Sequence, residues 1–229
     1  MTHDAVVQRD ARSGLPRPSS LVTRRRFVQG WLGAGLAVLV PGLAGGVLTA
    51  CSEAVDPTAS AVIDLGTETG LLNFIYAVQQ LELDYYSRIM WTTPFPGLLA
   101  TEATTLNNAI NQLTTSTQNL RTAIPAGRIT DVIVFRTGHV IDPSDRGSVL
   151  TNAQIIEDAA AAGFAAVVGL VHTPSVVTLA STLAAQAAGR AAAIRTMAGS
   201  PAAPVTSRPP RDVVLTLEPY YLTTITVRG

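Results

Sequence analysis

Four charged residues interrupt the apolar stripes that helical periodicity defines in this chain. Glu82, Glu102 and Glu157 each share a helical face with apolar residues, and Arg190 does the same further along. A buried charge is costly unless it is paired, bound to a metal or neutralised. Three inward carboxylates and one guanidinium therefore predict either a site for a hard cation or a buried ion-pair cluster. An error of one position in the period would explain any one of them, but one charge on each of four helices favours a common site.

Four helical stretches carry these charges. Apolar residues recur at helical spacing over about 67–91, 98–124, 152–171 and 175–199. The break at Thr173 and Pro174 is so short that we expect the last two helices to be antiparallel neighbours. The second and third helices are separated by a long connection, residues 125–149. We therefore predict an all-α fold, a four-helix bundle made of two helical hairpins joined by a long crossover.

A small β element is expected beside the bundle. Residues 129–134 of the crossover and residues 213–217 and 222–227 of the tail are alternating or β-branched runs. We predict that the crossover and the tail form this element together. The resulting divisions are a leader at 1–51, a tether at 52–66, the bundle at 67–199 and a C-terminal tail at 200–229.

The helical motifs resemble a known family. Residues 72–74 and 81–86 look like the first helix of the bacterial and plant desiccation-related ferritin-like proteins. Residues 156–158 with Phe164, and residues 179–195, look like the third and fourth helices of that family. The resemblance covers nearly all of residues 67–199. It implies a ferritin-like four-helix bundle, the alternative being an Ala-rich bundle with no functional ancestry.

The resemblance also implies positions for metal ligands. In ferritin-like di-metal sites two helices each give a Glu, and two give Glu-x-x-His. Three of the six positions keep a carboxylate: Glu82, Glu102 and Glu157. The other three hold residues that do not bind metal: Thr105, Ala187 and Arg190. We therefore expect a degenerate di-metal site without a cofactor, in which Arg190 pairs with one or two of the glutamates and takes the place of the metal.

A second hypothesis keeps a metal. Three carboxylates could hold a single hard cation, with waters as further ligands. The protein would then be a metal-binding ferritin-like oxidoreductase that uses iron or manganese at Glu82, Glu102 and Glu157. The sequence does not decide whether the protein is an enzyme, although the lost ligands favour a structural, interaction-based or stress-related role.

The first 51 residues resemble an export signal. Arg24, Arg25 and Arg26 precede a Gly-rich apolar run, as in a twin-arginine leader, and residues 48–51 resemble a lipoprotein cleavage box that ends at Cys51. The glycines and Pro41 make a membrane-spanning helix a poorer explanation. The resemblance implies export by the twin-arginine translocase to the periplasm or cell surface, with the protein anchored to the membrane through lipidated Cys51.

The composition excludes several classes of function. The chain has no Lys, and after residue 51 it carries 10 Arg and 14 acidic residues, a net charge of −4 that argues against nucleic acid as a partner. Cys51 is the only cysteine, so an internal disulfide is excluded. The Ala-rich faces of the third and fourth helices leave a homo-oligomer open.

Overall fold

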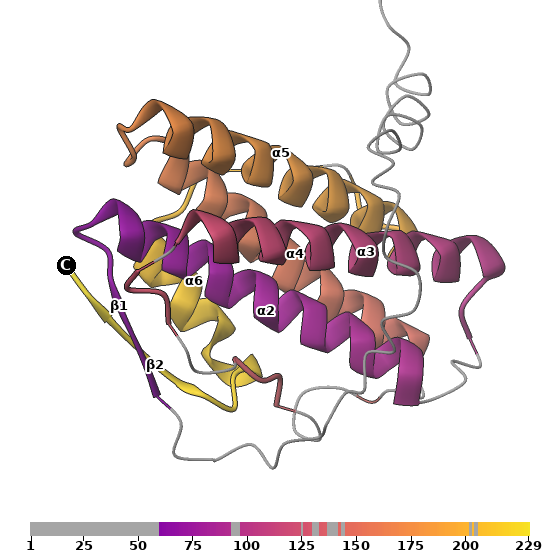
Figure 1. Cartoon of the computed structure of the whole chain (residues 1–229). Coiled ribbons are helices and arrows are strands. Elements are labelled where there is room, and N and C mark those ends of the chain that lie inside the picture. The colour runs from indigo at the N-terminus through magenta and orange to yellow at the C-terminus, as the bar shows by residue number, and fades with distance from the viewer. Residues whose placement is uncertain are drawn as a thin grey trace, which may run out of the picture. The chain divides into compact units, whose positions relative to one another are not determined.

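The computed structural model describes residues 60–92, 97–124, 126–129, 133–136, 142, 145–201, 203 and 206–229. The predicted leader, with Arg24, Arg25, Arg26 and Cys51, lies outside these residues. The elements in chain order are β1 (Ser60–Asp64), α2 (Glu68–Thr92), α3 (Ala100–Ala123), α4 (Arg146–Val168), α5 (Pro174–Met197), α6 (Pro210–Leu217), the 3-10 helix η1 (Glu218–Tyr220) and β2 (Thr224–Arg228) (Figure 1). Within the described part of the chain, no helix combines the length and apolarity that crossing a membrane requires.

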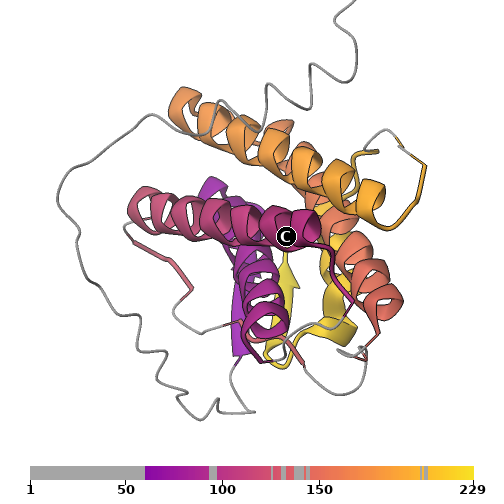
Figure 2. The same cartoon turned by 90° about the vertical axis from the view of Figure 1, so that its right-hand side faces the viewer.

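The four long helices form two antiparallel hairpins, α2 with α3 and α4 with α5. Ser116 of α3 donates a hydrogen bond to Gln79 of α2, and Arg121, further along α3, donates to Tyr76, which precedes Gln79. The two hairpins pack through α2 against α4 and α3 against α5 (Figure 2). The prediction of a ferritin-like arrangement with a long crossover is therefore confirmed.

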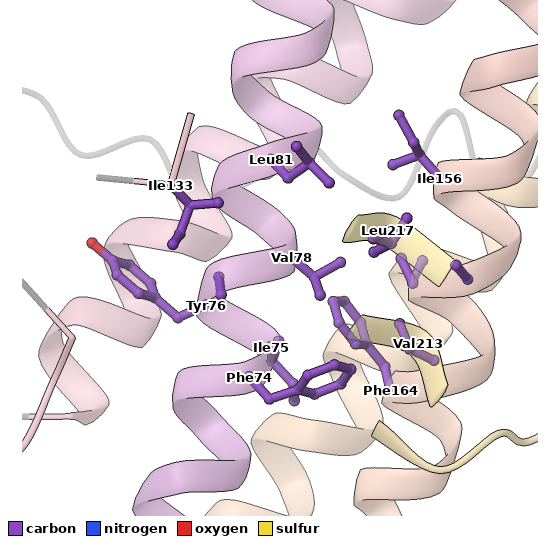
Figure 3. Packing of buried hydrophobic residues seen from close by; sticks show 14 of the residues in the cluster. Phe74, Ile75, Tyr76, Val78, Leu81, Ile133, Ile156, Phe164, Val213 and Leu217 are labelled. Carbon is purple, nitrogen blue, oxygen red and sulfur yellow. The ribbon is translucent and has the colours of Figure 1, made fainter. Parts of the chain in front are cut away.

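The core lies between α2 and α4 and is closed by α6. The rings of Phe74 and Phe164 meet edge to face with their centroids 6.2 Å apart, and Val213 and Leu217 of α6 point toward them (Figure 3). Gly163 lets these elements approach closely, because a Cβ at this position would lie 2.7 Å from Cζ of Phe74. This contact joins α2, α4 and α6 in one apolar cluster.

The tail differs from the prediction over residues 213–217. They form most of α6 rather than a strand, with Val213, Val214 and Leu217 buried on one helical face. Short apolar runs fit both periods, and Pro210 at the first helical turn supplies the start of a helix. Packing on α4 then selects the helical form.

The β element also has a different partner from the one predicted. Strand β2 pairs in parallel with β1, from Ser60 opposite Thr224 to Asp64 opposite Arg228. The strand β1 thus lies inside the segment that we predicted as a tether. The described part of the crossover contributes one isolated bridge, Phe135 with Tyr221, instead of a strand.

Candidate functional site

Arg190 of α5 lies in the middle of the bundle between two carboxylates. Its Nη2 donates to both carboxylate oxygens of Glu82 on α2, at 2.9 and 3.0 Å, and its Nε donates to both oxygens of Glu157 on α4, at 3.1 Å. Its Nη1 donates to Oε1 of Gln112 on α3 at 3.2 Å. The Arg190 side chain is 5% exposed, and the side chains of both glutamates are fully buried. Each long helix therefore contributes one polar side chain to this cluster, which we call the arginine cluster.

Small residues on α5 make room for the guanidinium. The buried stripe of this helix contains Ala187 and Ala191, one on either side of Arg190 along the chain. Because neither side chain extends past Cβ, the Arg190 side chain can cross the interior and reach both glutamates. The sequence pattern that placed Arg190 on the inward face of its helix agrees with this position.

The cluster contains one cation and two carboxyl groups. Complete burial raises the pKa of Glu82 well above its ordinary value, and although Arg190 opposes this shift, the neighbouring charge of Glu157 adds to it. Burial alone would lower the pKa of Arg190, but the charges of Glu157 and Glu82 raise it. The raised pKa favours a protonated Glu82, so that one carboxyl group of the cluster is neutral beside Arg190.

Two tyrosines border the cluster. The hydroxyl of Tyr86 donates to Oε1 of Glu157 at 2.8 Å, and burial together with the charge of Glu157 raises the pKa of Tyr86. The hydroxyl of Tyr221 is buried and has no hydrogen-bond partner among the described residues. Burial and the charge of Glu82 raise the pKa of Tyr221. Both phenols therefore remain protonated and neutral beside the carboxylates.

Glu102 does not join the arginine cluster, which corrects the prediction. It lies in the first turn of α3, where Oε2 accepts a hydrogen bond from the backbone N–H of Leu99 at 2.9 Å. It also pairs with Arg146 at the start of α4, and the hydrogen bond from Arg146 lowers the pKa of Glu102. A Glu in the first turn of a helix commonly caps the backbone there. The apolar periodicity of α3 includes position 102, but the Glu102 side chain binds the backbone of Leu99 and the guanidinium of Arg146 at the helix end.

Gln112 is the member of the cluster that sequence reasoning missed. It lies next to the buried Leu113 on α3, so it falls at the edge of the apolar stripe. Several amide side chains line this helix, and nothing in the sequence distinguishes Gln112 from them. Predicting Gln112 would require the register between α3 and α5, because that register decides which amide of α3 lies opposite Arg190.

The residues of the cluster do not fit a metal centre. The guanidinium of Arg190 lies within hydrogen-bond distance of both carboxylates, where a bound cation would need their oxygens, and it carries charge of the same sign. Across the residues that the structure describes, no group of three or more His, Cys, Asp or Glu side chains could hold a metal ion. Of the two histidines after the leader, His172 lies at the start of α5, and His139 lies outside the described residues.

The fold is a four-helix bundle in which two helices each direct a glutamate, Glu82 and Glu157, into the core. A family model described as a ferritin-like domain matches residues 67–200, which is more than half of the chain. The protein therefore belongs to the ferritin-like domain family. No curated protein matches this chain.

Proposed function

We propose that this protein is an exported, lipid-anchored ferritin-like protein in which Arg190 has replaced the metal. Its role at the cell envelope would be structural or interaction-based, with stress tolerance suggested by the resemblance to desiccation-related proteins. The observation that carries the proposal is the guanidinium of Arg190, held between Glu82 and Glu157 in the centre of the bundle.

An internal repetition between the hairpins supports this proposal. In each hairpin one helix gives a Glu to the cluster, and the other gives a polar residue that follows a buried Ala by three positions. The two sets are Glu82 with Ala109 and Gln112, and Glu157 with Ala187 and Arg190. The ferritin-like pattern has Glu on one helix and Glu-x-x-His on the other. Ala109 and Gln112, in place of the predicted Glu102 and Thr105, would then occupy the Glu and His positions of one hairpin, and Ala187 and Arg190 those of the other.

The direct test is the metal content of the full-length protein after exposure to Fe²⁺ and, separately, to Mn²⁺. We expect less than ~0.1 metal per chain, because a buried guanidinium already neutralises the carboxylates. Restoring the ligands with Ala109→Glu, Gln112→His, Ala187→Glu and Arg190→His is expected to raise the content to about two per chain. Uptake of about one metal per wild-type chain would reject the proposal.

The competing function is a metal-binding oxidoreductase, and one observation favours it. Glu82 and Glu157 still face the same point in the core, with Tyr86 hydrogen-bonded to the second carboxylate. A cation that displaced Arg190 would have these two carboxylates as ligands. Metal uptake by the wild-type protein, lost in Glu82→Gln, would support this function, and assays for iron oxidation or peroxide consumption would follow.

Export and anchoring have separate tests. Replacing Arg24, Arg25 and Arg26 by Lys is expected to leave the protein inside the cell, because the translocase requires the paired arginines. Replacing Cys51 by Ala is expected to preserve export but to release the protein from the membrane fraction, because no lipid can be attached. Fractionation and immunoblotting measure both results, and unchanged distributions would contradict this part of the proposal.

A further inference from the structure

The outward side of α3 carries no charged side chain until its last turn. Apart from Arg121 in that turn, its exposed polar residues are all hydroxyls or amides: Thr101, Thr104, Asn107, Asn108, Asn111, Thr114, Thr115, Gln118, Asn119 and Thr122. The two charged residues of this helix have partners, since Glu102 pairs with Arg146 and Arg121 donates to the hydroxyl of Tyr76. Such a surface is unusual, because charged residues normally cover the solvent side of a helix.

The neighbouring helix α5 extends this uncharged surface. Its exposed positions hold small or hydroxyl-bearing residues: Ser175, Thr178, Ser181, Thr182, Ala185, Ala192 and Thr196. Of its two arginines, Arg190 is buried and Arg195 is paired with Asp158 of α4. Both views show α3 and α5 side by side, on the side of the bundle away from β1, β2 and α6 (Figures 1 and 2). We call the exposed uncharged residues of α3 and α5 the neutral face.

We propose that the neutral face binds the neutral face of a second copy of this chain. Amide and hydroxyl groups both donate and accept hydrogen bonds, so the same surface can pair with itself across a two-fold axis. A surface that carries charges of one sign cannot do this without opposing like charges. The part of the chain after residue 51 has a net charge of −4, and two copies therefore repel each other least where neither presents a charge.

Other occupants fit this face less well. Nucleic acid and anionic membranes require basic side chains, which the middle of the face lacks. Neither α3 nor α5 contains an aromatic residue, so there is no ring on which a base or a sugar could stack. The partner that fits these observations is a protein with an uncharged surface, and a second copy of this chain has such a surface.

The size of the face suits a stable dimer. Each of the two helices has 24 residues. Each is therefore about 36 Å long, and two helices side by side present roughly 700 Å². A standard protein interface buries about 800 Å² from each partner. The neutral face is thus large enough for self-association without help from another surface.

Sedimentation equilibrium of the full-length protein over a range of concentrations tests the proposal. We compare wild type with Thr104→Glu/Thr115→Glu on the neutral face and with Thr151→Glu, an exposed threonine of α4, as the matched control. The double variant puts like charges opposite each other in the dimer, so its dissociation constant should rise by about tenfold or more. The control should match wild type. All three proteins keep the same first 51 residues, so an effect of the leader is common to them.

Three results would overturn the proposal. They are a wild-type protein that stays monomeric at all concentrations, a double variant that dimerises as wild type does, and a dimer that dissociates when salt is raised, which would indicate charged contacts. Circular dichroism checks that the variants fold, and Glu favours helix more than Thr does. The outcome is independent of metal content, so it can fail while the proposed function holds.

Discussion

Arginine suits the centre of this bundle because of the shape of its head group. The guanidinium is planar and has five N–H donors, and it can face two carboxylates at once while it reaches a third acceptor. Arg190 uses all three of its nitrogens in this way, toward Glu82, Glu157 and Gln112. A lysine would place a single charged atom in the same space and could not reach three helices in this geometry.

Removing Arg190 should destabilise the protein strongly. Arg190→Ala leaves two buried carboxyl groups without their cation, and breaking a buried pair in this way costs on the order of 3–5 kcal/mol. Urea unfolding of the full-length protein measures the effect. Arg195→Ala is the matched control on the same helix, because its pair with Asp158 is partly exposed and should contribute less than about 1 kcal/mol. Equal losses from the two variants would contradict a central role for Arg190.

The protonation of Glu82 should make stability depend on pH. The pKa of Glu82 is raised above its ordinary value of 4.5, so over the range above that value the folded protein holds a proton that the unfolded chain has lost. Stability therefore falls as the pH rises through this range. Glu82→Gln has no proton to lose, and its stability relative to wild type should increase from about pH 5 to about pH 8. A difference that stays constant over this range would show that Glu82 is ionised in the folded protein.

At the scale of elements, hydrogen bonds and an ion pair connect the ends of α5 to neighbouring helices. Glu68, in the first turn of α2, accepts hydrogen bonds from the backbone N–H groups of His172 and Thr173, at the start of α5. At the opposite end of the bundle, Arg146 pairs with Glu102 and donates to the carbonyl oxygen of Met197 at the end of α5. Both ends of α5 are therefore tied to helices of the bundle.

The cap formed by Glu68 should be lost in acid. Hydrogen bonds from Thr173 and His172 lower the pKa of Glu68 from 4.5 to about 2. A lowered pKa means that its stabilising effect is complete above 4.5 and disappears as the pH falls toward 2. The melting temperature of Glu68→Gln should therefore lie below that of wild type at neutral pH and approach it near pH 2. A difference that persists at that pH would mean that the carboxylate charge is not what holds α5.

Periodicity predicted the long helices because their inward faces are continuous, as on α2 from Leu71 to Ile89. It failed where a distant partner decides the structure. Residues 213–217 fit a strand as well as a helix, and only their contact with α4 selects α6. The periodicity predicted that Glu102 points into the core. Instead it binds Arg146, 44 positions further along the chain, at the end of its helix. Arg190 could be placed from sequence because the other buried residues of its own helix are all apolar.

At the scale of the whole molecule, the C-terminal tail belongs to the folded core. The family match ends at residue 200, but the apolar cluster continues through Val213 and Leu217 to Tyr221. Strand β2 then pairs with β1, so the two ends of the described domain meet in one sheet. The ferritin-like bundle in this protein is therefore completed by residues that the family pattern does not include.

This view predicts a large effect from a single residue of the tail. Leu217 is fully buried, and Leu217→Ala should lower the free energy of unfolding by about 2–5 kcal/mol through the cavity that it leaves. Leu215 lies on the same helix and is 60% exposed, so Leu215→Ala is the control and should change stability by less than about 0.5 kcal/mol. Urea unfolding followed by circular dichroism and by intrinsic fluorescence should give one shared transition for Leu217→Ala, shifted to lower urea. If the tail did not contribute to the stability of the bundle, the main helical transition of Leu217→Ala would keep the wild-type urea midpoint, because the four long helices would unfold independently of α6.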